Sequence, residues 1–284
     1  MQKNNNIFSD RTKTTHKIFS CVLLFICLSG CSKVERFLPC AQYHSSFRAV
    51  PAVIETPLFK IQSIRQFIGK GDVLRIYIEG DGRVWQGKKP SPDPSPKNPV
   101  LLNLMFQDPF SEKVYLARPC QFVNSAHCSP VWWTEKQYSQ EVIDSIDSAI
   151  TTIKRYKPWK KLELIGYSGG ATIALLIAAK RSDIISVRTI AGNLSPDLAF
   201  HLHKLSLPAS TLLPSNYLSK LELLPQIHYI GRHDAVVPQA IAQYYVEQFE
   251  NKKCIRYAVI PDTTHTKGWD NVWLSLLAQQ PQCS

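Results

Sequence analysis

Apolar residues recur along the chain in two patterns, as short continuous runs and as stripes at helical spacing. The short runs, rich in β-branched and aromatic residues, predict strands. They lie at residues 73–78, 113–117, 162–165, 184–190, 227–230 and 255–260, and residues 50–68 alternate in a way that predicts two earlier strands. Helices are predicted between them, at residues 100–106, 139–157, 171–180, 239–249 and 272–278.

The helix predicted at residues 139–157 has the clearest stripe. Its apolar positions recur three and four residues apart, which places them on one helix face. They are Val142, Ile143, Ile146, Ala149, Ile150 and Ile153. Pro158 ends this helix, because proline cannot continue one.

The alternation of strands and helices predicts a single α/β domain over residues 50–284. Several strands are apolar throughout, which is typical of a mostly parallel central sheet flanked by helices on both faces. Residues 90–99 hold five prolines and are expected on the surface, outside helices and central strands. Residues 191–217 contain leucines but no long helical stripe, so we expect a minimal lid of loops and no cap domain.

Composition places the chain among folded proteins. Of 284 residues, 44% are hydrophobic and 19% are charged, which excludes a disordered chain. The formal charge is +11, and +8 without residues 1–30, which carry four basic side chains against Asp10. A basic surface can attract anionic lipid or polymer. No basic helix interleaved with aromatic residues, zinc-finger spacing or RNA-binding signature occurs, so a nucleic acid is not an expected partner.

Residues 1–30 have the pattern of a targeting segment. A net-basic stretch precedes an apolar run at residues 18–28, which is too short to span a membrane. The run ends in Leu28-Ser29-Gly30-Cys31, which resembles the lipobox of bacterial lipoproteins, in which Cys31 is acylated. An ordinary secretory signal that ends near a cysteine is the alternative. Ser32 after the cysteine favours the outer membrane by the same resemblance, so we expect a lipid-anchored envelope protein with a tether at residues 31–49.

Export changes the interpretation of the cysteines, because the compartment allows disulfides. The cysteines that remain are Cys40, Cys120, Cys128, Cys254 and Cys283. We expect Cys120 to pair with Cys128 within one loop and Cys254 with Cys283, joining a late strand to the tail. Cys40 is then free. No C-x-x-C spacing occurs, so we expect no metal site.

Ser168 lies in Gly166-Tyr167-Ser168-Gly169-Gly170, between a predicted strand and a predicted helix. Glycines on both sides allow a tight strand-to-helix turn that exposes the serine hydroxyl at the helix N-terminus. A serine that only caps the helix is the alternative. The context favours a nucleophile.

Asp234 and His265 each follow a later strand. Ligands bind beyond the carboxyl ends of the strands in such sheets, so both side chains are expected near Ser168. The chain order Ser, Asp, His is that of hydrolases with a nucleophile elbow. Asp234 can orient a histidine base, although a lone aspartate here would be taken for a turn residue and a lone loop histidine for a solvated one.

Stabilisation of an oxyanion needs backbone N–H groups near Ser168. Gly169 follows the nucleophile directly and is expected to supply one. The turn after the strand at residues 73–78 is expected to supply another, from Gly80, Asp81 or Gly82, because glycines let the backbone approach a ligand closely.

With these residues in place, the chain resembles the α/β-hydrolase superfamily over about residues 50–280. The motifs at residues 77–82 (YIEGDG), 118–121 (RPCQ) and 166–170 (GYSGG) are similar to those of a group of bacterial exported hydrolases. The resemblance implies an α/β-hydrolase fold and acyl-transfer chemistry. The His-Gly pair of lipases is replaced by Glu79-Gly80, which leaves the oxyanion donors open. Arg118 is expected to brace this turn through Glu79 or Asp81, the alternative being an anionic group of the substrate.

The expected function is that of a serine hydrolase cleaving a small ester or amide with Ser168, His265 and Asp234, without metal or cofactor, and as a monomer. A peptidase or amidase with the same residues is one alternative. A non-catalytic binding protein of the cell envelope on the same fold is another. The sequence does not identify the natural substrate.

Overall fold

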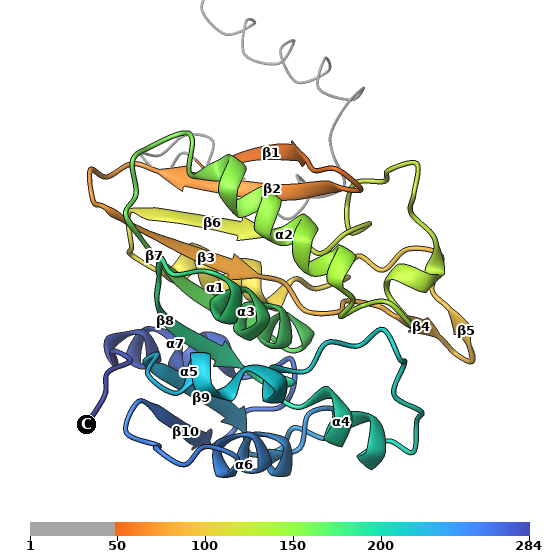
Figure 1. The fold of residues 1–284 in the computed structure, drawn as a ribbon. Helices are drawn as coiled ribbons and strands as arrows, with labels where there is room; N and C mark the ends of the chain where they lie inside the picture. The colour runs from red at the N-terminus through yellow and green to blue at the C-terminus, as the bar shows by residue number, and fades with distance from the viewer. Residues whose placement is uncertain (1–48) are drawn as a thin grey trace, which may run out of the picture.

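The computed structural model describes residues 49–284. An eight-stranded sheet runs through the domain (Figure 1) in the order β1-β2-β6-β3-β7-β8-β9-β10. The strands are β1 (Val50–Glu55), β2 (Lys60–Phe67), β6 (Glu112–Leu116), β3 (Val73–Ile78), β7 (Lys161–Tyr167), β8 (Ile184–Ile190), β9 (Gln226–Gly231) and β10 (Ile255–Ile260). Within this sheet the pairs β1–β2 and β2–β6 are antiparallel, and the other pairs are parallel.

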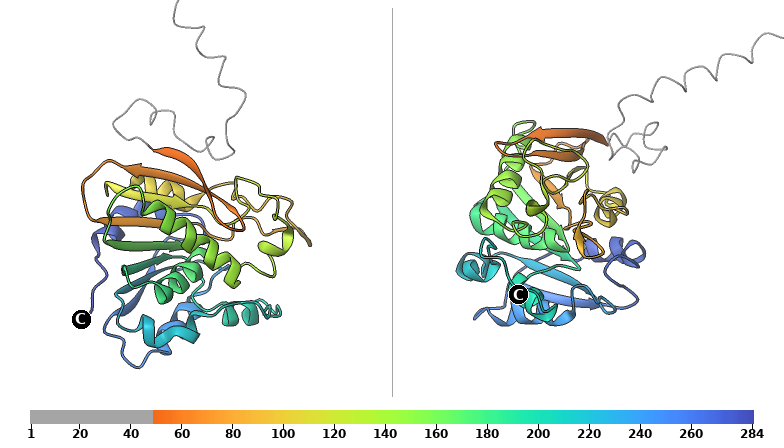
Figure 2. Two further views of the ribbon diagram at one scale, coloured as in Figure 1. Left: turned by 45° about the horizontal axis from the view of Figure 1, so that its top comes forward. Right: turned by 90° about the vertical axis from the view of Figure 1, so that its right-hand side faces the viewer.

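Helices cover both faces of the sheet, as expected for strands that are apolar on both sides. On one face lie α2 (Gln140–Ile153), α3 (Gly169–Lys180) and α6 (Gln239–Glu247), and on the other α1 (Val100–Gln107) and α7 (Trp269–Ala278) (Figure 2). Each face has its own apolar cluster. The fold predicted from the sequence, including the two early strands, is therefore confirmed.

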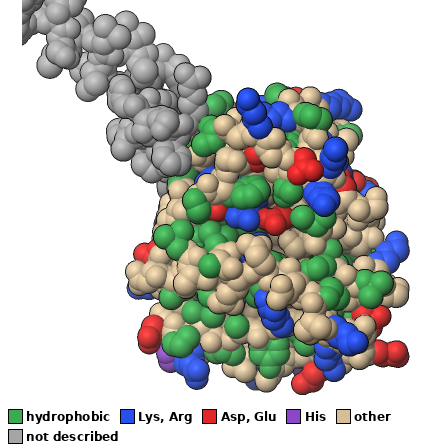
Figure 3. Space-filling view, turned by 90° about the vertical axis from the view of Figure 1, so that its left-hand side faces the viewer, with side chains coloured by type: hydrophobic (Ala, Val, Ile, Leu, Met, Phe, Trp, Pro, Cys, Tyr) green, Lys and Arg blue, Asp and Glu red, His purple; other side chains and the backbone are tan. Residues whose placement is uncertain are grey.

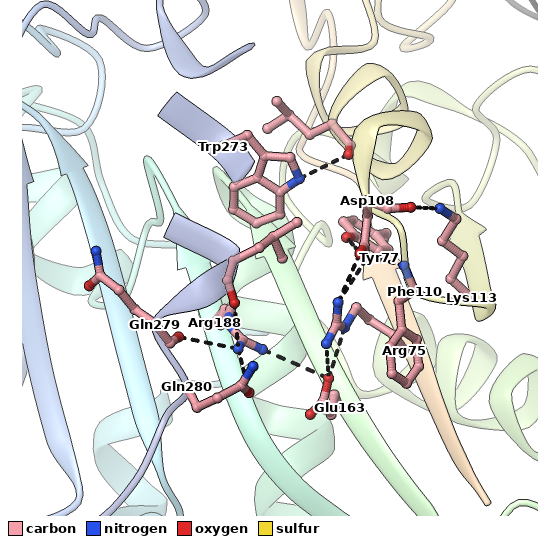
Figure 4. Close-up of polar contacts among 12 residues, drawn as sticks. Arg75, Tyr77, Asp108, Phe110, Lys113, Glu163, Arg188, Trp273, Gln279 and Gln280 are labelled. Atoms are coloured by element: carbon pink, nitrogen blue, oxygen red, sulfur yellow. Dashed lines mark hydrogen bonds and ion pairs between the residues drawn. The ribbon is translucent and has the colours of Figure 1, made fainter. Parts of the chain in front are cut away.

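Buried charges lie under α1 and α7 (Figure 4). Arg75 on β3 pairs with Asp108 at 2.8 Å and with Glu163 on β7 at 2.7 Å. Arg188 on β8, fully buried, donates to Gln280 of the C-terminal tail at 2.9 Å. Buried ions need partners of this kind, and here the pairs tie adjacent strands and the tail together.

Both predicted disulfides are present, Cys120–Cys128 and Cys254–Cys283. Cys254 immediately precedes β10, so its bond holds the tail to the sheet. The predictions for the signal segment, the tether, Cys31 and Cys40 fall outside the described residues. Among residues 49–284, no helix is long and apolar enough to cross a membrane.

The proline-rich segment lies outside the helices and the central strands, as predicted, but its placement on the surface is correct only in part. Residues 90–99 were expected on the surface, but Ser91 is fully buried and Pro94 is buried too. The carbonyl of Pro94 accepts a hydrogen bond from the N–H of Arg83 at 2.9 Å. The segment therefore packs against the turn that follows β3.

Several short elements were not predicted, among them two 3-10 helices at Pro130–Trp132 and Pro214–Tyr217. A hairpin, β4 (Trp85–Gln86) and β5 (Lys89–Pro90), follows the β3 turn, and the short helices α4 (Pro196–Leu202) and α5 (Leu218–Leu221) lie between β8 and β9. The hairpin and α4 lie beyond the carboxyl ends of the parallel strands (Figure 1). Between residues 49 and 284 these short elements lie at this end of the sheet, and no separate cap domain is present there.

Candidate active site

Ser168 lies on a tight turn between β7 and α3. Its backbone angles are φ 52° and ψ −125°, a strained combination for a residue with a side chain. A Cβ on Gly166 would come within 2.6 Å of the Cα of Ala171, and one on Gly170 would clash with the carbonyl oxygen of Ile78. The two flanking glycines therefore permit the turn that holds Ser168 in this conformation.

Ser168, His265 and Asp234 form a continuous chain of hydrogen bonds. The Oγ of Ser168 lies 3.0 Å from Nε2 of His265, and Nδ1 of His265 lies 2.9 Å from Oδ2 of Asp234. The side chain of Asp234 is fully buried. A carboxylate can only accept, so Nδ1 carries the imidazole proton and Nε2 is free to accept the serine proton.

The loops after β9 and β10 fix the two partners of Ser168. The other carboxylate oxygen of Asp234 accepts the N–H groups of Val236 at 2.9 Å and Val237 at 2.8 Å. The carbonyl of His265 accepts a hydrogen bond from the hydroxyl of Tyr167 at 2.8 Å. The three side chains thus follow separate strands: Asp234 is held by its own loop, and the loop of His265 is held by Tyr167 of β7.

The turn after β3 lies against Ser168. A Cβ on Gly80 would come within 3.0 Å of the Cβ of Ser168. The N–H of Gly80, one of the three donors considered for this turn, already donates to Oε1 of Glu79 at 2.8 Å. The N–H groups of Asp81, Gly82 and Gly169 have no acceptor among the described residues and are the candidates that remain.

Arg118 and Gln121 brace this turn. Arg118 pairs with Asp81 at 2.8 Å and also donates to the carbonyl of Gln137. The side-chain amide of Gln121 donates to the carbonyl of Gly80 at 3.0 Å. The bracing role expected for Arg118 is thus the one its contacts support, with Asp81 and not Glu79 as its partner.

Glu79 is a buried acid at the base of the same turn. Besides the N–H of Gly80, it accepts a hydrogen bond from the hydroxyl of Tyr115 at 2.8 Å. Burial raises the pKa of Glu79 to about 7, against the opposing effect of these hydrogen bonds. The sequence placed Glu79 next to the site but did not reveal that its side chain folds back onto the turn.

A cavity of about 430 Å³ opens from Ser168 to the surface. Its lining is mainly apolar, with Tyr138 and Asn193 near the serine and Trp85, Phe200 and Leu205 further out. The unpredicted hairpin contributes Trp85 and Pro90 to this wall, and α4 contributes Ala199 and Phe200. A mainly apolar cleft with a few polar groups is typical of a site for a small molecule.

Two polar residues that line the cavity near Ser168, Tyr138 and Asn193, were not predicted from the sequence. The hydroxyl of Tyr138 lies 3.0 Å from Oδ2 of Asp81, and the N–H of Asn193 donates to the carbonyl of Ser168 at 3.0 Å. Neither residue belongs to a local motif, so only the folded chain identifies them. Within residues 49–284, no group of His, Cys, Asp and Glu side chains is arranged to hold a metal ion.

Comparison with known proteins gives one family. The family model described as "Serine hydrolase (FSH1)" matches residues 60–266, a range that contains Ser168, Asp234 and His265. No curated protein matches the sequence.

Solved structures share the fold at low sequence identity. An α/β serine hydrolase without a lid from Xanthomonas campestris has a TM-score of 0.53 and 14% identity, covering 81% of this chain and 91% of that one. An esterase from Pyrococcus furiosus has a TM-score of 0.57 and 14% identity, covering 82% and 91%. An acylaminoacyl peptidase from Pyrococcus horikoshii has a TM-score of 0.57 and 10% identity, covering 79% and 38%. These matches show the α/β-hydrolase fold.

Proposed function

The chain belongs to the FSH1 family of serine hydrolases, and on this basis we propose that it cleaves carboxylic esters with Ser168 as nucleophile. The observation that carries the proposal is the 3.0 Å contact between the Oγ of Ser168 and Nε2 of His265, on a turn whose backbone is strained to present the serine. Strain of this kind persists where surrounding structure maintains it, and it is concentrated at functional sites.

In the first half of the reaction, Oγ of Ser168 bonds to the ester carbonyl carbon while its proton passes to Nε2 of His265. Asp234 stabilises the imidazolium that forms. The N–H groups of Gly169 and Asp81 donate to the negative oxygen, each contributing roughly 3–4 kcal/mol to the lowering of the barrier. The carbon–oxygen bond to the alcohol then breaks, and His265 returns the proton to the leaving oxygen.

In the second half, water attacks the acyl-enzyme. His265 takes a proton from the water, the new bond to the carbonyl carbon forms, and the bond to Oγ of Ser168 breaks. The acid leaves, and the proton on His265 returns to the serine. The only reactants are the ester and water, so the residues of this chain account for every proton moved.

A comparison of substrates tests the proposal. Wild-type protein is assayed with short p-nitrophenyl esters and with peptide p-nitroanilides, and Ser168→Ala serves as the inactive control. We expect ester hydrolysis that disappears in Ser168→Ala. Faster hydrolysis of the anilides than of the esters would identify the protein as a peptidase instead of an esterase. If neither the esters nor the anilides are hydrolysed, the proposal is contradicted.

We also propose that the protein is exported and acylated at Cys31. The support is the Leu28–Cys31 tetrad behind an apolar run of eleven residues. Cells fed a labelled fatty acid should label the wild type and not Cys31→Ala. Label that persists in the variant would contradict acylation at this residue.

A further inference from the structure

Large apolar side chains are exposed around the mouth of the cavity. Three segments supply them: the β4–β5 hairpin, the chain from the end of α4 and the loop after β9. We call these side chains the apolar rim, and its members are Trp85, Leu202, Leu205, Leu207 and Val236. Trp85, Leu205 and Val236 are 52%, 58% and 53% exposed, and all three also line the cavity. Single exposed apolar residues are common, but a cluster at the mouth of a cavity marks a binding surface.

The segment after α4 shows the exposure most clearly. Residues 201–207 (HLHKLSL) are all exposed, although three of the seven are leucines. Nε2 of His203 lies 2.8 Å from the carbonyl of Val236, so this segment is tied to the loop after β9. The side chain of His203 therefore holds this segment at the mouth, with 38–58% of the surface of each of its three leucines exposed.

Basic side chains are interleaved with the rim. Four basic residues lie close to rim residues in the sequence: Lys88 and Lys89 after Trp85, Lys204 between two rim leucines, and Arg232 before Val236. All four side chains are exposed, and none forms an ion pair with a described residue. Residues 83–90 and 201–208 contain no acid, and the acid in residues 231–238 is the buried Asp234. Glu135 is an exposed acid that also lines the cavity.

The opposite end of the molecule differs in charge pattern. Figure 3 shows the face at the amino ends of the parallel strands, where Lys and Arg side chains are mixed with Asp and Glu. At the mouth of the cavity, by contrast, the exposed apolar side chains lie in segments that carry exposed basic residues and no exposed acid, namely residues 83–90, 201–208 and 231–238. Such a combination is typical of protein surfaces that insert into the interface of an anionic bilayer.

We propose that the apolar rim and its four basic neighbours dock on an anionic lipid surface, so that ester substrates enter the cavity from the lipid. This inference rests on the proposed function, because the cavity leads from the rim to Ser168. A second copy of the chain fits less well, since a two-fold interface would bring the basic side chains of both copies together. A bilayer of phosphatidylglycerol supplies negative charge at its surface and an apolar interior beneath.

Enzyme assays on vesicles test the docking. The full chain is assayed with p-nitrophenyl laurate in vesicles of phosphatidylglycerol or phosphatidylcholine, and with soluble p-nitrophenyl butyrate. The wild type should turn over the laurate about tenfold faster in phosphatidylglycerol, because each basic residue near an anionic surface strengthens binding roughly fivefold. The double variant Lys88→Glu/Lys204→Glu should lose this advantage and keep its rate on butyrate within twofold. Leu202→Ser/Leu207→Ser should lower the laurate rate on both kinds of vesicle.

Matched substitutions away from the mouth serve as controls. Lys252→Glu, before β10, and Leu274→Ser, on α7, change exposed side chains of the same types and should behave as the wild type. Equal laurate rates in the two kinds of vesicle, or equal losses in rim and control variants, would overturn the proposal. So would a dimer that Leu202→Ser/Leu207→Ser dissociates while laurate rates stay unchanged.

A binding readout separates this inference from the proposed function. Brominated phosphatidylglycerol should quench the fluorescence of Trp85, measured as the difference between wild type and Trp85→Phe. Quenching without hydrolysis of any ester would contradict the esterase and leave the docking surface standing. Hydrolysis of butyrate without quenching would contradict the docking surface alone.

Discussion

At the scale of single residues, Asp234 has different partners on its two carboxylate oxygens. One accepts the N–H groups of Val236 and Val237, and the other faces Nδ1 of His265. In Asp234→Asn, the side-chain carbonyl keeps the two backbone donors, and the amide NH₂ faces Nδ1. The imidazole proton must then move to Nε2, which can no longer accept a proton from Ser168.

Asp234→Asn should therefore lower kcat for ester hydrolysis by roughly 10³- to 10⁴-fold. Its thermal unfolding midpoint should stay close to that of the wild type. Asp270→Asn, on the exposed side of α7, is the control and should keep full activity. A tenfold loss or less in Asp234→Asn would mean that His265 does not depend on this carboxylate.

Glu79 links stability to pH. Its pKa is about 7 in the folded chain, against an ordinary value of 4.5. Between pH 4.5 and 7 the folded chain thus binds more protons than the unfolded chain, so the free energy of unfolding falls as the pH rises through this range. The loss from Glu79 is roughly 3 kcal/mol.

Urea unfolding at pH 5 and pH 8 measures this effect against Glu79→Gln. Glutamine can still accept the N–H of Gly80 and interact with the hydroxyl of Tyr115, but it does not titrate. We expect the wild type to lose stability relative to Glu79→Gln between the two pH values. A difference between the two proteins that does not change with pH would contradict the raised pKa.

Residues that act through motifs could be predicted from the sequence. Ser168 was identified by its flanking glycines, and Asp234 and His265 by their places after later strands. Gly80 was one of three residues considered as an oxyanion donor, and nothing in the sequence shows that the side chain of Glu79 turns back onto its N–H. Tyr138 and Asn193 were missed since they reach Ser168 through tertiary contacts alone.

At the scale of elements, the β7–α3 turn depends on close packing against β3. A Cβ on Gly170 would clash with the carbonyl oxygens of Ile78 and Glu79, whereas one on Gly71 would meet nothing within 4 Å. These two glycines form a matched pair, because one substitution meets fixed backbone and the other open space.

Gly170→Ala should lower the thermal unfolding midpoint sharply and reduce kcat, since the turn must move to admit the methyl group. An overpacked core position of this kind costs about 1–3 kcal/mol or more. Gly71→Ala should leave both quantities nearly unchanged. Equal midpoints for the two variants would contradict the packing of this turn.

The regular elements were predictable from periodicity, and the irregular ones were not. Strand β3 and helix α2 have apolar patterns that extend over their whole length. The β4–β5 hairpin has strands of two residues, and α4 has only two buried residues. Elements so short show no periodicity, and the apolar residues of the rim therefore gave no signal of their own.

At the scale of the whole molecule, the two disulfides differ in loop length and in the segments that they hold. Cys254–Cys283 spans 29 residues and joins the tail to the sheet, while Cys120–Cys128 spans eight. The shorter bridge begins two residues after Arg118 and encloses Gln121, which braces the turn at Gly80. Loop entropy makes the longer bridge the more stabilising one.

Cys254→Ser/Cys283→Ser should lower the free energy of unfolding by roughly 3–4 kcal/mol, and Cys120→Ser/Cys128→Ser by roughly 2–3 kcal/mol. The second variant should lose more kcat than the first, because its segment supports the oxyanion turn. Urea unfolding of both variants checks which one loses more unfolding free energy, and ester assays check which one loses more kcat. A larger loss of kcat in the first variant would contradict the bracing role of the shorter loop.

The central claim is that Ser168 is a nucleophile activated by His265 and Asp234. A fluorophosphonate reacts covalently with such a serine, and intact mass spectrometry with peptide mapping locates the adduct. We predict one adduct per chain, on Ser168, absent in Ser168→Ala and strongly slowed in His265→Ala. No adduct on the folded wild-type protein, or an adduct on another residue, would contradict the claim.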